Sequence, residues 1–182
     1  MELSESLFSL IPHSALQSVA ALQVVAHNNT SARYGLSLTH AEATELVATQ
    51  SRALADTGRV SFGGGVIEAL IDAFCDSPYL SQRDWAEALH ELVELFYYMK
   101  TETDDTIGDG ELIDRMKRWF DGRCGGSLEL LAGRELEALA RRIRFGEQDD
   151  FCLDGEASEG SAYDTPYGYD VPLGQENWRD DL

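Results

Sequence analysis

Apolar residues recur at intervals of three and four positions along most of this chain, the spacing of one face of an α-helix. Six segments share this pattern and carry helix start or stop residues at their ends. The piece 59–62 is strand-like but too short to found a sheet. We therefore predict an all-α fold, a bundle of about six helices. The predicted helices run from after Pro12 to about Asn28, from Thr39 to Gly58, from Val66 to before Pro78, from Ser81 to about Glu102, from Asp109 to Gly122 and from Ser127 to Ile143.

Two local signals sharpen this prediction. Thr39 is followed three residues later by Glu42, which forms a capping box and marks a helix start. The segment after Ser81 carries an apolar stripe whose members fall within about 40° of one line at 100° per residue. Such a stripe is typical of a helix that faces a core rather than a cofactor. Its members are Trp85, Leu89, Leu92, Phe96 and Met99.

The helical pattern stops at Glu147. The residues that follow are rich in Asp, Glu, Gly and Ser, with a few aromatic side chains among them. A segment of this composition buries too little apolar surface to offset the entropy of ordering. We predict two parts, a helical domain over 1–146 and an acidic, flexible tail over 147–182.

Charge is sorted along the chain. The formal net charge is −19, yet residues 115–144 are net +4 and residues 145–182 are net −10. One hypothesis is that the acidic tail masks this basic strip through its collective field, because single surface pairs contribute only about 0–1 kcal/mol. The alternative is that cations gather in the last turns of two helices, where the helix dipole favours them. The basic strip consists of Arg115, Lys117, Arg118, Arg123, Arg134, Arg141, Arg142 and Arg144.

Composition argues against several classes of protein. Three cysteines without a CxxC spacing argue against a disulfide framework or a zinc finger. No apolar run approaches the ~20 residues of a membrane span, and the start over 1–5 is acidic where a signal peptide is basic. We expect a cytoplasmic protein that does not bind membranes. The strong negative charge also disfavours nucleic acid as a partner.

Two motifs resemble metal sites but lack required parts. Glu87 and His90 have the Glu-x-x-His spacing of di-iron bundles, which need two such motifs, and both residues face away from the apolar stripe. Asp105 and Asp109 fit two positions of a calcium loop, whereas Ile107 stands where a carboxylate is required. Helix capping by Asp109 explains the acids better. We predict no metal and no cofactor.

The glycine run Gly63, Gly64 and Gly65 leads into a predicted helix and has Arg59 nearby. Free N–H groups at a helix start could cradle an anion or a small ligand. The lysine of a P-loop is absent, and a tight turn that lets backbones approach closely is the plainer explanation.

Cys124 is the candidate nucleophile. It lies beside Arg123 and just before the helix that begins at Ser127, and both features lower the pKa of a thiol. The arginine that phosphatases carry six residues later is missing, because Leu130 stands there. We favour a loop cysteine without a catalytic role, with thiol chemistry as the alternative. Cys75, at the end of an apolar helix, is expected to be buried.

Four runs of the chain combine glycine, cysteine and aromatic residues in distinctive ways; they are Thr57–Gly65, Ala73–Tyr79, Leu89–Tyr98 and Phe120–Leu136. The stretch from about residue 34 to 144 that contains them resembles an uncharacterised family of small proteins from anaerobic Gram-positive bacteria, a domain of unknown function. The resemblance implies a bacterial, intracellular protein and implies no activity or site.

Three functions remain open. The first, which we favour, is a non-catalytic interaction or regulatory domain whose acidic tail masks the basic strip. The second is a small-ligand or thiol-dependent enzyme that uses the glycine run and Cys124. The third is an acidic mimic of nucleic acid that engages a basic protein through the helix over 84–105 and the tail. The sequence leaves open which protein is the partner and whether the helix from Trp85 to Met99 also forms a homodimer.

Overall fold

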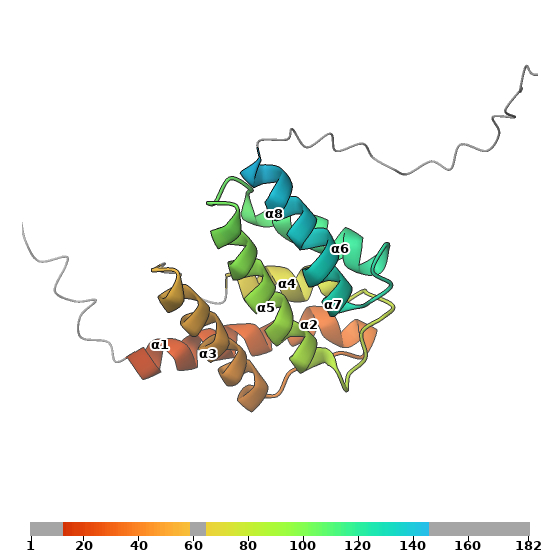
Figure 1. Cartoon of the computed structure of the whole chain (residues 1–182). Coiled ribbons are helices and arrows are strands. Elements are labelled where there is room, and N and C mark those ends of the chain that lie inside the picture. Colours follow the sequence, from red (N-terminus) through yellow and green to blue (C-terminus); the bar gives the residue numbers. More distant parts are fainter. Residues whose placement is uncertain (1–12, 59–64, 146–182) are drawn as a thin grey trace, which may run out of the picture. The chain divides into compact units, whose positions relative to one another are not determined.

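The computed structural model describes residues 13–58 and 65–145 (Figure 1). Every regular element in these ranges is helical, so the all-α prediction is confirmed. The strand-like piece 59–62 and the tail over 147–182 lie outside the described residues. The elements are α1 (His13–Ala26), α2 (Asn28–Ser31), a 3₁₀ turn (Ala32–Tyr34), α3 (His40–Asp56), α4 (Val66–Phe74), α5 (Trp85–Glu102), α6 (Asp109–Asp121), α7 (Leu128–Leu130), a π-helical stretch (Leu131–Leu136) and α8 (Glu137–Arg144).

The last three elements form one continuous helix over 128–144, which gives the six long helices that the sequence predicts. The caps that start two of these helices are confirmed. Thr39 and Glu42 form both hydrogen bonds of the capping box, and the side chain of Ser127 accepts from the backbone N–H of Leu130. Both predictions hold because a capping contact involves only residues three positions apart.

One predicted helix start is wrong. Helix α5 begins at Trp85 and not at Ser81. The hydroxyl of Ser81 donates to the carboxylate of Asp84, 2.7 Å away, within the turn that precedes the helix. Ser81 therefore stabilises this turn, and the helix starts four residues later.

Helix α5 lies at the centre of the bundle and packs against α3 and α4 (Figure 1). The predicted stripe from Trp85 to Met99 is buried along its whole length, each member being 0–1% exposed. Helices α4 and α6 pack on each other, and α6 also contacts the π-helical stretch. The prediction that this stripe faces a core is confirmed.

The loop between α5 and α6 is organised around Lys100. Its ammonium lies 2.7 Å from the backbone oxygen of Ile107, 3.0 Å from Asp105 Oδ1 and 2.7 Å from Asp109 Oδ1. The prediction that Asp109 caps α6 is therefore wrong: the N-cap is Gly108, and no side chain caps the helix. Asp105 and Asp109, which fit two positions of a calcium loop, thus form ion pairs with the ammonium of Lys100.

Candidate interaction groove between helices α3 and α5

An open groove of about 550 Å³ runs between α3 and α5. Side chains spaced three or four residues apart line it from both helices, because this spacing keeps them on one helical face. From α3 come Glu42, Glu45, Ala48, Thr49 and Arg52, and from α5 come Ala86, Glu87, His90 and Glu94. The groove exists because alanine stands at positions 48 and 86, where a larger side chain would fill the space.

The lining of the groove is acidic. Four glutamates and one arginine, Arg52, are among its lining residues. Three of these glutamates, Glu45, Glu87 and Glu94, are exposed. Glu42 completes the capping box with Thr39, and its hydrogen bonds to the backbone and side chain of Thr39 lower its carboxyl pKa below the ordinary value. The groove therefore keeps a negative potential at neutral pH, and clefts lined by one sign of charge concentrate ligands of the opposite sign.

A hydrogen-bonded chain joins the two helices at the groove. Arg52 Nη2 donates to Thr49 Oγ1 over 3.0 Å, and the same oxygen lies 2.9 Å from His90 Nδ1. A hydroxyl beside an imidazole resembles a nucleophile with its general base. Here Thr49 is 3% exposed, and its oxygen already accepts from a guanidinium, which withdraws electron density from it. The chain positions the two helices against each other, and this hydroxyl is a poor nucleophile.

A second hollow of about 370 Å³ continues the groove toward the carboxyl ends of both helices. The two hollows share Thr49, Arg52 and Glu94. The second is lined in addition by Asp56 and by two tyrosines of α5. Tyr97 is buried and its hydroxyl accepts from Gln50 Nε2 over 3.1 Å, whereas Tyr98 is 48% exposed. One end of the groove is thus acidic, and the other combines acids with an accessible aromatic ring.

The structure describes only part of the glycine run. Arg59, Gly63 and Gly64 lie outside the described residues. Gly65 is the residue before α4, is exposed, and has a φ of +42°, a conformation that glycine adopts without the strain of a side chain. Anion binding at this run stays a prediction.

Cys124 is buried in the loop before α7, with an exposed fraction of 5%. Burial raises the pKa of its thiol, and the nearby charge of Glu135 raises it further, while Arg134 lowers it. The thiol therefore stays protonated at neutral pH, which opposes the activation that its neighbours in sequence suggested. Cys75 is 1% exposed, as expected, and burial likewise raises its thiol pKa.

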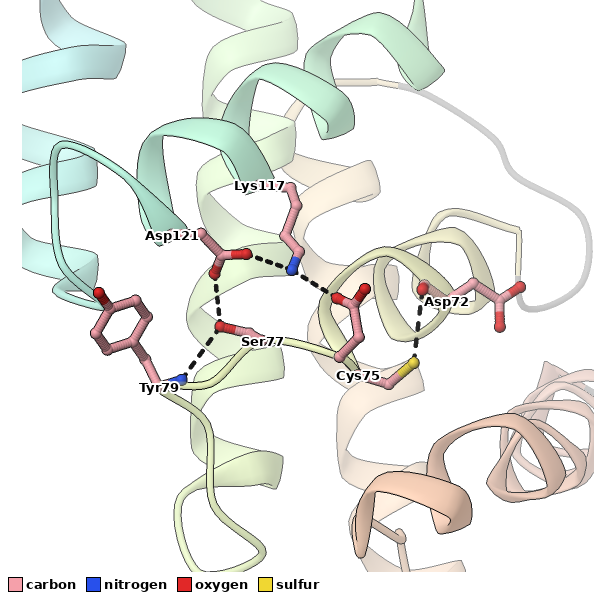
Figure 2. Close-up of polar contacts among 7 residues, drawn as sticks. Asp72, Cys75, Ser77, Tyr79, Lys117 and Asp121 are labelled. Carbon is pink, nitrogen blue, oxygen red and sulfur yellow. Dashed lines mark hydrogen bonds and ion pairs between the residues drawn. The ribbon is translucent and has the colours of Figure 1, made fainter. Parts of the chain in front are cut away.

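Lys117 of the predicted basic strip belongs to a cluster that joins the loop after α4 to α6 (Figure 2). Its ammonium lies 2.6 Å from Asp76 and 2.5 Å from Asp121, and Ser77 Oγ donates to the other oxygen of Asp121 over 2.6 Å. Burial alone lowers the pKa of Lys117, but the hydrogen bonds to Asp121 and Asp76 outweigh burial and raise it above the ordinary value. The ammonium of Lys117 is therefore already paired with two carboxylates of the domain.

The same cluster explains two of the distinctive sequence runs. Tyr79 lies two residues after Ser77 (Figure 2). Its ring packs edge-on against Phe120, with centroids 6.3 Å apart. Gly126 has a φ of +84°, and a Cβ built there would lie 2.4 Å from Tyr79 Cβ. Tyr79 of the run 73–79 therefore packs against Phe120 and Gly126 of the run 120–136.

Other cations of the basic strip also contact carboxylates of the body. Arg115 pairs with Glu111 at 2.8 Å, and Arg144 pairs with Glu102. Glu135 lies 3.7 Å from Arg123 and 3.5 Å from Arg134, and Arg141 lies 3.7 Å from Glu137; each of these three arginines is more than half exposed. Arg118 and Arg142 also have interactions. The positive charge of the strip is thus partly compensated locally, and the proposed contact with residues 147–182 lies outside the described residues.

The sequence predicted that two of the residues that line the groove, Glu87 and His90, face away from the apolar stripe of α5. The structure confirms that Glu87 is exposed, whereas His90 is half-buried beside Thr49. The α3 half of the groove was missed, because periodicity within one helix does not tell which helix lies beside it. Within residues 13–58 and 65–145, no three His, Cys, Asp or Glu side chains come together as a metal site requires.

The fold and the groove define an all-helical domain with an open acidic groove between two of its helices. Residues 23–149 match a family of unknown function, DUF6323, and the chain belongs to that family. The resemblance over residues 34–144 to a domain of unknown function falls inside this range and is confirmed. Comparisons with curated proteins and with solved structures found no match. Among the described residues, no helix has both the length and the apolar content needed to cross a membrane.

Proposed function

We propose that this chain is a non-catalytic interaction domain that binds a basic segment of a protein partner in the groove between α3 and α5. The observation that carries the proposal is the lining of the groove, which combines carboxylates of two helices with two alanines. Lysine and arginine side chains have an apolar stem and a cationic head, so they suit a lining that combines apolar groups with carboxylates.

The aromatic end of the groove extends this match. Tyr98 is exposed in the same hollow as Asp56 and Glu94. A guanidinium group stacks on a tyrosine ring and pairs with a carboxylate at the same time, which an ammonium group does less well. Because the two hollows share lining residues, an extended segment with several arginines would contact both.

Other surfaces support a function less well. The raised thiol pKa of Cys124 argues against thiol-dependent catalysis at neutral pH. Several cations of the basic strip already form ion pairs with carboxylates of the domain. Lys117, for example, pairs with both Asp76 and Asp121. The third function considered from the sequence, an acidic mimic of nucleic acid, also has a basic protein as its partner. In the present proposal the partner binds in the groove between α3 and α5 and not along the whole helix over 84–105.

The proposal is tested with a fluorescently labelled oligo-arginine peptide and fluorescence anisotropy at low salt. The double variant Glu87→Gln/Glu94→Gln removes two carboxylates that line the groove. Exposed ion pairs contribute about 0–1 kcal/mol each, so loss of two should lower the affinity by up to about thirtyfold. Binding of the unaltered chain should also weaken as salt screens the charges.

The matched control is Glu91→Gln/Glu129→Gln. Both residues are exposed, Glu91 lies on α5 between the two altered glutamates, and neither lines the groove. The control removes the same net charge, and we expect the peptide affinity to stay nearly unchanged. An equal loss in both double variants would show that only the overall charge attracts the peptide, and the groove proposal would be wrong. Failure of the unaltered chain to bind the peptide would also contradict it.

A further inference from the structure

The acidic groove between α3 and α5 contains one arginine at its middle. Arg52 is exposed and lines both hollows, so it lies where the two hollows meet. Within the part of the chain that the structure describes, its guanidinium forms no ion pair with a carboxylate. Asp56 follows Arg52 at the spacing at which helical ion pairs form, yet the two are not paired. The positive charge of Arg52 is therefore available to a ligand in the groove.

A hydrogen bond holds the guanidinium of Arg52 in place. Its Nη2 atom donates to Thr49 Oγ1 over 3.0 Å, and the same oxygen lies 2.9 Å from His90 Nδ1. Side chains of a helix lean toward its amino end, which brings Arg52 back toward Thr49, one turn earlier. A guanidinium has five N–H donors in a planar fork, and the bond to Thr49 uses one of them. The group can still form the paired hydrogen bonds by which arginine recognises a carboxylate.

The charges along the α3 side of the groove alternate in sign. Glu45 lies two turns before Arg52 and Asp56 one turn after it, which is about 10 Å and about 6 Å along the helix. A ligand that matches this order has an anionic group at Arg52 and a cation on either side. An extended peptide advances about 3.3 Å per residue. The matching cations therefore stand about three residues from the acid on one side and about two on the other.

From these observations we infer that the groove recognises a segment in which one acidic residue is flanked by arginines, and that Arg52 selects the acid. The ligand is the basic segment of the proposed function, on which this inference rests. Attraction by net charge alone depends on the charge of the peptide and not on where an acid stands in it. Recognition by Arg52 depends on that position, because only an acid between the cations reaches the guanidinium.

Three fluorescently labelled peptides separate position from charge. The first is Arg-Arg-Gly-Glu-Gly-Arg-Arg, which places arginines two and three residues from the acid in both chain directions. The second, Glu-Arg-Arg-Gly-Gly-Arg-Arg, has the same composition but carries the acid at its end. The third has Gln in place of the central Glu. By fluorescence anisotropy at low salt, we expect the unaltered chain to bind the first peptide about two- to fivefold more tightly than the second.

The variant Arg52→Gln tests which residue recognises the acid. It should abolish the preference for the first peptide over the second. It should also bind the third peptide more tightly than the unaltered chain does, because a cation has left the groove. The matched control is Arg141→Gln, which removes the same charge from an exposed position of α8 that lines neither hollow. The control should keep the preference, and circular dichroism confirms that both variants are folded.

Two results would overturn the inference and leave the proposed function intact, provided that binding still depends on Glu87 and Glu94. The first is equal affinity of the unaltered chain for the first and second peptides. The second is a preference between these peptides that persists in Arg52→Gln. If none of the three peptides binds to the unaltered chain, the proposed function and the inference are both wrong.

Discussion

Replacing Lys100 with methionine removes an ammonium group from the interior while nearly keeping the shape of the side chain. The carboxylates of Asp105 and Asp109 are 51% and 61% exposed, so water can replace the ammonium there. Ile107 is 5% exposed, and its carbonyl oxygen loses the 2.7 Å bond from Lys100. A buried carbonyl left without a partner costs about 1–3 kcal/mol. We expect Lys100→Met to lower the free energy of unfolding by about 2–3 kcal/mol.

The pH dependence of this loss is specific. Burial lowers the pKa of Lys100, but the hydrogen bonds to Asp109 and Asp105 outweigh burial and raise that pKa above the model-peptide value of 10.5. A group whose pKa is higher in the folded state stabilises fully below its unfolded pKa, and the stabilisation is lost as pH rises through the folded pKa. The stability difference between the unaltered chain and Lys100→Met should therefore be constant from neutral pH to about pH 9 and shrink above the unfolded value.

Urea unfolding followed by circular dichroism, repeated at several pH values, measures the loss of unfolding free energy and its pH dependence. The control is Arg83→Met, which removes one positive charge from an exposed position and should change the unfolding free energy by less than about 0.5 kcal/mol. Equal losses in the two variants would refute the reasoning, because they would reflect net charge and not the buried bond. A difference that persists unchanged well above the raised pKa would refute the assigned cause.

Two further predictions concern packing and the tail. Gly126→Ala should cost about 2–5 kcal/mol, from a left-handed backbone and the clash with Tyr79. Gly125→Ala, at a φ of +55° with open space around it, should cost only about 1–2 kcal/mol in the same urea titration. Equal costs would contradict the Tyr79 contact. Deleting residues 147–182 should raise the salt concentration that elutes the chain from heparin if the tail masks the basic strip, and unchanged elution would disprove masking.

The sequence predicted the elements whose causes are local. Helix periods, the capping box at Thr39 and Glu42, and the cap at Ser127 involve residues within one or two turns of each other. The buried stripe of α5 was equally predictable, because a helix with one apolar face buries that face. The start of α5 was placed too early, since Ser81 and Asp84 hydrogen-bond in a turn as readily as they begin a helix.

Some polar residues have partners that only the tertiary structure supplies. Asp109 carries the sequence signature of a helix cap, and the fold gives its carboxylate to Lys100 instead. Lys117 belongs to the basic strip by sequence. Asp121 pairs with it one turn further along α6, and the packing of α4 on α6 adds Asp76 as a second partner.

The surfaces available for binding also depend on how the helices pack against one another. The acidic groove needs α3 beside α5, and this pairing brings Arg52 of α3 into the same groove as the glutamates of α5. Periodicity in one helix states which side is apolar but not which helix lies against it. The sequence thus determined the helices and the core of α5, whereas the pairing of helices decided which charges meet and which surfaces remain open.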